Sequence, residues 1–157
     1  MSNIWFMSDL HLGHRNILKY RPEFSSIEEH DDTIIDNCNS VMHKRDILWL
    51  LGDICFTSES LELLKRIRGT KKIIAGNHDI NAQLFTQEYV GFVGGLKSYK
   101  GFWLSHAPLH PDELRGKHNI HGHMHREIID DSRYVNVCCE QLDYRPMSLE
   151  AIRSLYD

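Results

Sequence analysis

One apolar run near the N-terminus leads directly into an acid and a histidine: Asn3-Ile4-Trp5-Phe6-Met7-Ser8-Asp9-Leu10-His11. The apolar part is short and continuous, which is typical of a buried strand. In an extended segment, residues i and i+2 point to the same side, so Asp9 and His11 are predicted to face one ion together. This stretch therefore predicts a strand that carries a pair of polar groups beyond its carboxyl end.

Two further buried strands are predicted over residues 47–51 and 72–75, with a helix before each of them. Ser26 and Glu29 form a capping box at the start of the first helix. The second helix begins at Ser58 and is closed by a glycine. A strand–helix–strand–helix–strand order predicts a parallel sheet.

The second half of the chain has a different pattern. Short runs over residues 89–93, 96–99 and 101–105 are separated by glycines, so we expect strands connected as hairpins. Another strand is predicted over residues 134–138, and Ser148 is expected to cap a short last helix.

Composition is that of an ordinary globular protein. The 157 residues are 41% hydrophobic and 25% charged, and we expect residues 1–157 to form a single domain. No apolar run is long enough to span a bilayer and the N-terminus lacks signal-peptide features, so we expect no membrane association and a cytoplasmic location. The four cysteines form no C-x-x-C pair and are expected to be reduced. A net charge of −4 gives no overall attraction to nucleic acid.

Polar residues follow each predicted strand, where ligands bind in open α/β sheets. Asp53 follows the second strand and Asn77 the third, His106 follows a later strand, and His121-Gly122-His123-Met124-His125 follows another. Glycines before Asp53, Asn77 and His123 allow sharp turns or close approach of the backbone. Mixed carboxylate, imidazole and amide ligands suit manganese, iron, zinc or nickel better than calcium or magnesium.

This ordered set resembles the calcineurin-like metallophosphoesterase family, in particular its short phage and bacterial members. The motifs are Asp9-x-His11, Gly52-Asp53, Gly76-Asn77-His78, His106 and Gly122-His123-x-His125. Each motif alone is common, whereas the complete set in this order is specific. The resemblance implies an α/β fold, namely a calcineurin-like β-sandwich of mixed sheets flanked by helices in four αββα layers.

The resemblance also implies roles for these residues around two divalent ions, with Mn²⁺ preferred and iron, zinc or nickel as alternatives. One ion would be held by Asp9, His11 and His125, and the other by Asn77, His106 and His123. Asp53 would bridge both ions, and a metal-bridging hydroxide would attack the phosphorus atom. His78 would act as a general acid or a transition-state hydrogen-bond donor, oriented by Asp79.

Four other histidines have open roles. His14 either lines the substrate pocket or lies on the surface. His110 could replace His106 as a ligand, although the position of His106 after a strand favours His106. We interpret His121 as a structural residue behind the ligands and His30 as a surface or helix-face residue.

The predicted reaction is hydrolysis of a phosphate ester, with a phosphodiester preferred and a small phosphomonoester as the alternative. Protein phosphatase activity is less expected, because Asp53 is followed by Ile54 and Cys55 where such enzymes carry Asp-Arg-Gly. The substrate partner is a phosphate ester, with nucleotides and nucleic acids among the candidates, and no obligate protein partner is evident. A non-catalytic metal-binding scaffold of the same fold is the rival hypothesis, which the presence of every ligand and of His78 argues against.

Overall fold

The first of two sheets carries most of the parallel pairing. The computed structural model describes the backbone of residues 1–157 and every side chain except those of residues 81 and 82. The five strands of this sheet lie in the order β4-β3-β2-β1-β9 and are β1 (Ile4–Met7), β2 (Ile47–Leu50), β3 (Thr70–Ile74), β4 (Val90–Gly94) and β9 (Met147–Ser148). Strands β1 to β4 are parallel, as predicted for the first three, and β9 pairs antiparallel with β1.

The second sheet has four strands in the order β5-β6-β7-β8, namely β5 (Leu96–Tyr99), β6 (Phe102–Ser105), β7 (His118–His121) and β8 (Tyr134–Asn136). Strands β5 and β6 form the predicted hairpin, whereas β6, β7 and β8 are parallel. The predicted hairpin between residues 89–93 and 96–99 is wrong, because β4 pairs with β3 in the other sheet. Only Gly95 separates β4 from β5, and one residue is too short to reverse a strand.

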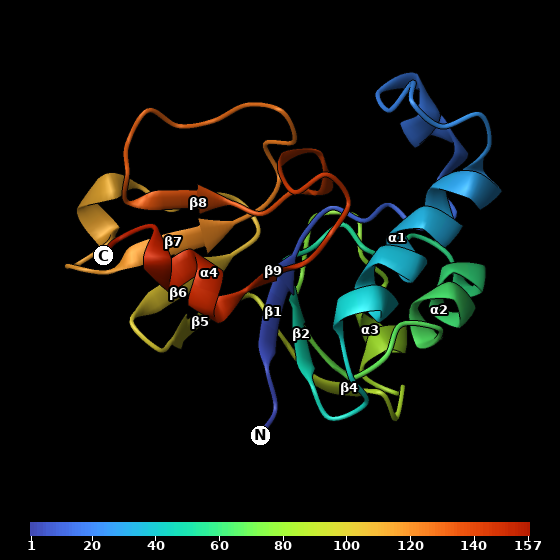
Figure 1. Ribbon diagram of the computed structural model, residues 1–157, viewed down its shortest axis with the longest axis horizontal. Coiled ribbons are helices and arrows are strands. Elements are labelled where there is room, and N and C mark those ends of the chain that lie inside the picture. The colour runs from blue at the N-terminus through green and yellow to red at the C-terminus, as the bar shows by residue number, and fades with distance from the viewer.

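The two sheets pack face to face, and helices cover the outer face of the first sheet (Figure 1). These helices are α1 (Ile27–Val41), α2 (Ser58–Lys65) and α3 (Asn81–Leu84), while α4 (Leu149–Ser154) packs beside β1 and β9. Short 3-10 helices lie at η1 (Arg15–Lys19), η2 (Pro111–Glu113) and η3 (Cys139–Gln141). The chain is thus an α/β sandwich of mixed sheets flanked by helices, as the resemblance implies.

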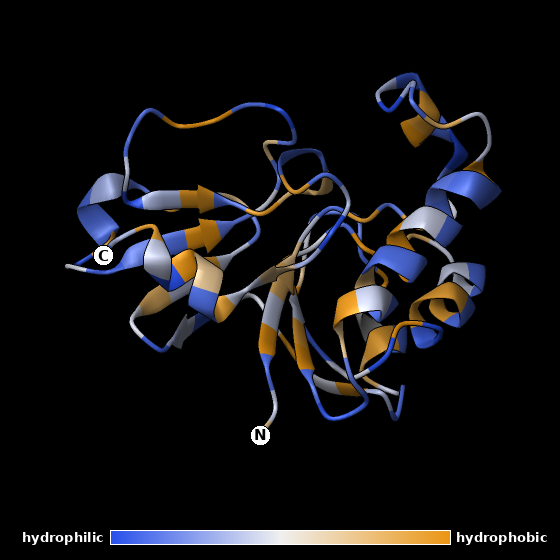
Figure 2. Ribbon diagram, viewed as in Figure 1, coloured by the Kyte–Doolittle hydropathy of each residue, from blue (hydrophilic) through white to orange (hydrophobic). Residues whose placement is uncertain are grey.

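Alternate side chains of β1 and β2 enter two separate cores. Met7 and Leu50 face the helices, whereas Phe6 and Trp49 face the second sheet, and all four are buried. Figure 2 shows the apolar stretches concentrated in the strands and on the inner sides of the helices. The four cysteines are free and buried, as predicted. Among the described residues, no helix has the length and apolar character required to cross a membrane.

Side-chain caps begin two of the helices. The Ser26 hydroxyl accepts a hydrogen bond from the Glu29 amide at 3.1 Å, which confirms the predicted cap of α1. The Glu29 carboxylate reaches one residue further back than predicted and accepts from the Ser25 amide at 3.1 Å. Ser148 caps α4 in the same way, through the Ala151 amide at 3.1 Å. Each cap satisfies an amide that the first helical turn leaves without a partner.

Candidate metal centre

The polar residues that follow β1, β2, β3, β6 and β7 lie together, at the end where these strands terminate. Backbone hydrogen bonds join the segments: the Asp9 amide donates to the Gly52 carbonyl at 3.0 Å, and the Gly122 amide donates to the His106 carbonyl at 2.8 Å. The His106 ring also reaches across to the first sheet, where its Nδ1 lies 2.7 Å from the Leu51 carbonyl oxygen. Segments far apart in sequence therefore form one cluster.

Asp9 is the centre of one half of this cluster, which we call the Asp9 half (Asp9, His11 and His125). Its Oδ1 lies 3.9 Å from His11 Nε2 and 3.5 Å from His125 Nε2. Its Oδ2 accepts hydrogen bonds from the Ser8 hydroxyl at 2.6 Å and the His123 amide at 2.8 Å. Asp9 Oδ1 and His11 Nε2 are buried and lack a hydrogen-bond partner among the described residues. Unpaired buried polar atoms are costly, and a cation between them would satisfy both.

Asp53 is the centre of the other half, which we call the Asp53 half (Asp53, Asn77, His106 and His123). Its Oδ2 lies 3.5 Å from His106 Nε2 and 3.2 Å from His78 Nδ1. His106 Nε2 is also 3.1 Å from Asn77 Oδ1 and 3.2 Å from His123 Nδ1. In this half the side chains already contact one another, and every predicted ligand of the second ion is present.

The two halves adjoin at their carboxylates. One ligand atom each from Asp9, His11 and His125 lie within 4.8 Å of one another, and the same holds for Asp9, Asp53 and His106. Asp9 belongs to both groups, so two cations held there would be close neighbours. A set of carboxylates and imidazoles at this separation fits divalent transition metals.

The backbone at these residues is unusual. Asp9, His11, Asp53, His123 and His125 all have φ between 51° and 71°. Left-handed conformations are uncommon for residues other than glycine and cost on the order of 1 kcal/mol each. Asp9 and His11 do lie close together, but the predicted reason, an extended segment with both side chains on one side, is wrong. The strand ends at Met7, and two left-handed residues bring the side chains together instead.

Two glycines allow the loops to approach one another closely, as the sequence predicts. A β-carbon at Gly122 would collide with the Ser8 hydroxyl and with Asp9 Oδ2. A β-carbon at Gly76 would collide with the amide nitrogen and Oδ1 of Asp53. A side chain at either position would therefore push apart the loops that form the cluster.

Asp79 has a role different from the predicted one. Its carboxylate accepts hydrogen bonds of 2.7–3.1 Å from four backbone amides, those of Asp53, Ile54, Cys55 and Gly76. The prediction that Asp79 orients His78 is wrong, because these amides occupy both carboxylate oxygens and the described contacts include none with the His78 ring. His78 Nδ1 faces Asp53 instead, and Asp79 fixes the loop after β2 against the loop after β3.

His125 is supported by a buried ion pair that the sequence analysis missed. Glu140 Oε2 lies 2.7 Å from His125 Nδ1, and Glu140 Oε1 accepts from Arg21 at 3.0 Å. Arg21 is fully buried and also donates to the carbonyl oxygens of Asp9, at 2.6 Å, and of Leu10, at 3.1 Å. A carboxylate behind the imidazole is the usual support of a histidine ligand. Glu140 follows the strand predicted over residues 134–138, so the strand-end argument could have identified it.

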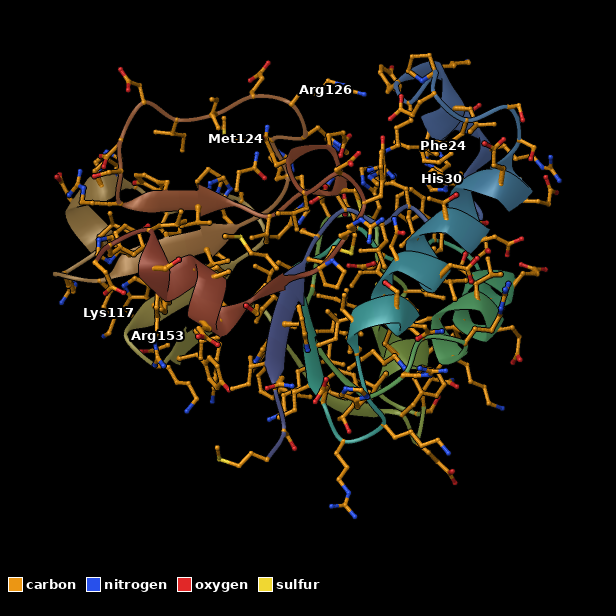
Figure 3. The ribbon with its side chains drawn as sticks, in the orientation of Figure 1. Phe24, His30, Lys117, Met124, Arg126 and Arg153 are labelled. Carbon is orange, nitrogen blue, oxygen red and sulfur yellow. The ribbon has the colours of Figure 1, made fainter. Side chains whose placement is uncertain are left out.

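His30 belongs to the same buried network. Its Nε2 lies 2.8 Å from Arg21 Nη1, and its Nδ1 lies 2.8 Å from Asp31 Oδ1. Asp31 in turn accepts from the Gly13 amide at 3.1 Å. Figure 3 places His30 at the start of α1, beside the segment that carries η1. Of the two predicted alternatives, the surface position is wrong and the helix face is confirmed, since His30 lies on the buried face of α1. Its imidazole is buried because it pairs with the buried Arg21 guanidinium.

The remaining histidines differ in their distance from the cluster and in their burial. The His14 ring stacks on the His11 ring with centroids 5.4 Å apart, which places it beside the cluster. His110 is 71% exposed and caps η2 through the Asp112 amide, so it does not replace His106. His121 is buried at the end of β7, where its Nδ1 lies 2.9 Å from the Gly122 carbonyl oxygen.

Burial and hydrogen bonding set the charges of the cluster. Burial lowers the pKa of His11 from 6.5 to about 3, so the imidazole is neutral. Burial raises the pKa of Asp53, but hydrogen bonds from His106 and His78 outweigh it and hold that pKa well below its usual range. A neutral imidazole and an ionised carboxylate are the forms that bind a cation.

Known proteins resemble this chain over nearly its whole length. Residues 2–142 match the calcineurin-like phosphoesterase family. An uncharacterised protein of Methanocaldococcus jannaschii is 36% identical over 172 aligned positions, which cover 100% of this chain and 93% of that protein. The Gene 66 protein of Mycobacterium phage L5 is 32% identical and covers 82% of this chain and 80% of its own length.

A solved structure supports the same assignment. The crystal structure of a protein of unknown function from Aquifex aeolicus aligns with a TM-score of 0.78 at 26% identity. The alignment covers 99% of this chain and 100% of that one. Since the family match spans most of the sequence and the fold agrees, the chain belongs to the calcineurin-like phosphoesterase family.

Proposed function

We propose that this protein hydrolyses phosphate esters with two divalent metal ions and prefers phosphodiesters to phosphomonoesters. The observation that carries the proposal is that two buried atoms, Asp9 Oδ1 and His11 Nε2, find no hydrogen-bond partner in the described part of the chain. They lie beside a second cluster around Asp53 that is close enough to share Asp9. Family membership supports metal-dependent hydrolysis of a phosphate ester.

The ligands divide as the two halves of the cluster do. Asp9, His11 and His125 would hold one ion, and Asn77, His106 and His123 would hold the other, with Asp53 between them. Manganese is the first choice, with iron, zinc or nickel as alternatives. When bound, such a pair lowers the pKa of a water nucleophile and neutralises charge on the phosphoryl oxygens.

We assign the transfer of a proton at the mouth of the site to His78. Its side chain is 57% exposed, and its Nδ1 lies 3.2 Å from Asp53 Oδ2. His78 would donate a proton to the departing alkoxide or stabilise the charge that develops on it.

The preference for a diester follows from the small number of cationic side chains near the site. Among the described residues of the two halves, none is a lysine or an arginine. The adjacent Arg21 guanidinium is fully buried and already bound to Glu140 and to two carbonyl oxygens. Two divalent ions would bring four positive charges, of which Asp9 and Asp53 offset two and a bridging hydroxide one. The single positive charge that remains matches the single negative charge of a phosphodiester.

The proposal is tested with protein reconstituted with Mn²⁺. Bis(p-nitrophenyl) phosphate and p-nitrophenyl phosphate separate diester from monoester hydrolysis through the same coloured product. We expect turnover of both, with the larger kcat/KM for the diester. Protein that binds two ions and cleaves neither ester would support the scaffold hypothesis instead.

A further inference from the structure

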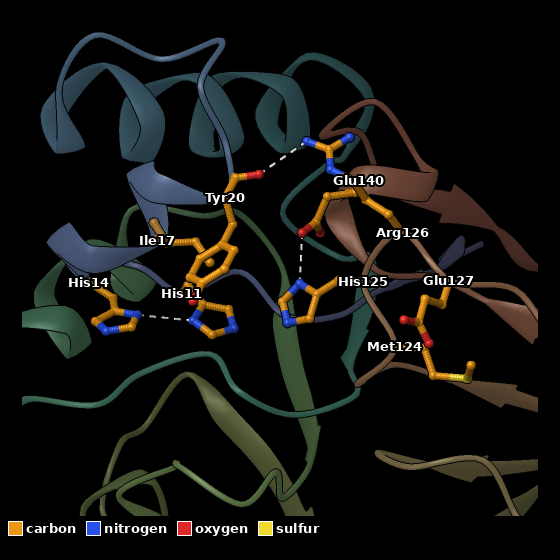
Figure 4. A pocket seen from close by; sticks show the side chains of 9 residues that line it. All are labelled: His11, His14, Ile17, Tyr20, Met124, His125, Arg126, Glu127 and Glu140. Atoms are coloured by element: carbon orange, nitrogen blue, oxygen red, sulfur yellow. Dashed lines mark hydrogen bonds and ion pairs between the residues drawn. The ribbon is translucent and has the colours of Figure 1, made fainter.

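A pocket of about 440 Å³ opens beside the Asp9 half of the cluster (Figure 4). It shares His11 and His125 with that half. The rest of its wall comes from His14, Ile17 and Tyr20 on one side and from residues 124–127 and Glu140 on the other. Pockets of about 300–1,000 Å³ hold small molecules, so this one accommodates more than a phosphate group.

The surface of this pocket is largely apolar. Ile17 is buried against it, and Met124 faces it from the loop after β7. Tyr20 is 70% exposed although it is a large aromatic residue. Figure 4 shows its ring directed into the pocket above His11. An exposed tyrosine at the edge of an apolar pocket is suited to contact another ring.

The charged groups in the wall are mostly paired already. The Glu140 carboxylate is only 1% exposed and binds within the Asp9 half. Arg126 donates to the Tyr20 carbonyl oxygen at 3.2 Å (Figure 4) and lies 3.7 Å from Glu23, so it joins the two sides of the pocket. Among the described lining residues, Glu127 alone carries a charge with no ion pair, and it is negative. This pocket therefore suits a neutral group better than a second anion.

The position of the pocket also selects one arm of the substrate. His78, the proposed proton donor, contacts Asp53, whereas the pocket adjoins His11 and His125. If the departing alkoxide lies next to His78, the other ester arm lies on the side of the Asp9 half. The pocket is thus available to the arm that stays on the phosphorus atom.

We propose that this pocket binds a planar, uncharged ring, either a nucleobase or an aryl group, on the ester arm that does not leave. The proposal rests on the proposed function for the position of the phosphorus atom. Tyr20 supplies a ring for stacking, which tolerates different ring identities. Arg126 and Glu127 lie at the rim, where they would distinguish the polar edge of a base from a plain aryl ring.

The test compares three p-nitrophenyl diesters that share a leaving group and a charge. Their second arms are thymidine 5′-yl, phenyl and ethyl. We expect the Mn²⁺-loaded protein to prefer the two ring-bearing esters over the ethyl ester by about tenfold or more in kcat/KM. Tyr20→Ala should lose this preference and keep its activity on the ethyl ester. Phe85→Ala, which removes an aromatic side chain of similar 66% exposure outside this pocket, should change nothing.

Each outcome of this comparison is decisive. Similar rates on all three esters, or an equal loss on all three in Tyr20→Ala, would overturn the ring-binding pocket and leave the proposed hydrolysis intact. A thymidine ester that exceeds the phenyl ester supports recognition of a base, and equality of these two supports stacking alone.

A binding measurement separates the pocket from the reaction. Calorimetry compares thymidine 5′-monophosphate with ethyl phosphate on the metal-loaded protein. If no ester is hydrolysed, the proposed function fails, yet a Tyr20-dependent preference for the nucleotide of about tenfold would still support the pocket. Equal affinities for the two phosphates would contradict it.

Discussion

The Asp9 half and the Asp53 half of the cluster are held in place by different kinds of hydrogen bond. In the Asp9 half, a chain of side chains runs from Arg21 through Glu140 to His125. In the Asp53 half, the hydrogen bonds run to backbone groups. His106 is bound to the Leu51 carbonyl oxygen, and the Asp79 carboxylate accepts from four backbone amides of the surrounding loops. A single side-chain substitution should therefore loosen the first half without disturbing the fold, whereas the second half depends on the loops themselves.

Asp53→Asn should have the largest effect, because it removes the carboxylate that is proposed to lie between the two ions. The substitution keeps the shape of the side chain but not its anionic oxygen. We expect tight binding of both ions to be lost and kcat/KM to fall by about 10³-fold. Asp112→Asn, an exposed acid on η2, is the matched control. Retention of two tightly bound ions in Asp53→Asn would count against a bridging role.

His78→Ala should separate chemistry from metal binding within the Asp53 half. The side chain contacts Asp53 but is not one of the proposed ligands. We expect kcat to fall by about 10²–10⁴-fold, as for other general acids. Metal content measured by atomic emission should stay at the wild-type value. Full turnover in this variant would rule out a catalytic role for His78.

Glu140→Gln tests the side-chain support of the Asp9 half. The substitution removes the charge behind His125 and keeps the size of the side chain and an amide oxygen that can still accept from Arg21. We expect a loss of about 10–100-fold in the affinity for one of the two ions, with the other ion unaffected. Isothermal titration of metal-free protein resolves the two sites. Glu127→Gln, in the wall of the pocket beside the Asp9 half, is the control and should leave both metal affinities unchanged. If Glu140→Gln weakened both metal sites equally, the two halves would not have separate supports.

Asp79→Ala tests the backbone support of the Asp53 half and should have the smallest direct effect on chemistry. Four amides lose their acceptor, and unsatisfied buried donors cost about 1–3 kcal/mol of stability. Urea denaturation of the metal-free protein measures this loss, with the exposed Asp130→Ala as control. A variant as stable as the wild type would show that these loops are held by other contacts.

The sequence was sufficient to predict the general position of the site, because the ends of the strands can be recognised from the apolar runs. Asp9, Asp53, Asn77 and His106 each follow an apolar run, and the carboxyl ends of parallel strands meet at one edge. The assignment of β4 to the first sheet was missed, although the single residue between β4 and β5 already excludes a hairpin.

The supports of the ligands were harder to foresee. Arg21 and Glu140 are 119 positions apart and meet only after both sheets have formed, and no local pattern marks a charged residue as buried. His30 lies on a helix whose apolar stripe is visible, yet its burial depends on Arg21. The left-handed backbone at Asp9 and His11 is likewise imposed by contacts with the loops after β2 and β7.

The number of divalent ions that the folded chain binds tests the central claim most directly. Calorimetric titration of metal-free wild-type protein with Mn²⁺ measures it without a substrate. Two ions per chain, bound with resolvable affinities, is the result expected from two adjoining ligand groups that share Asp9. Binding of a single ion, or of none, would contradict a dinuclear centre at this end of the sheets.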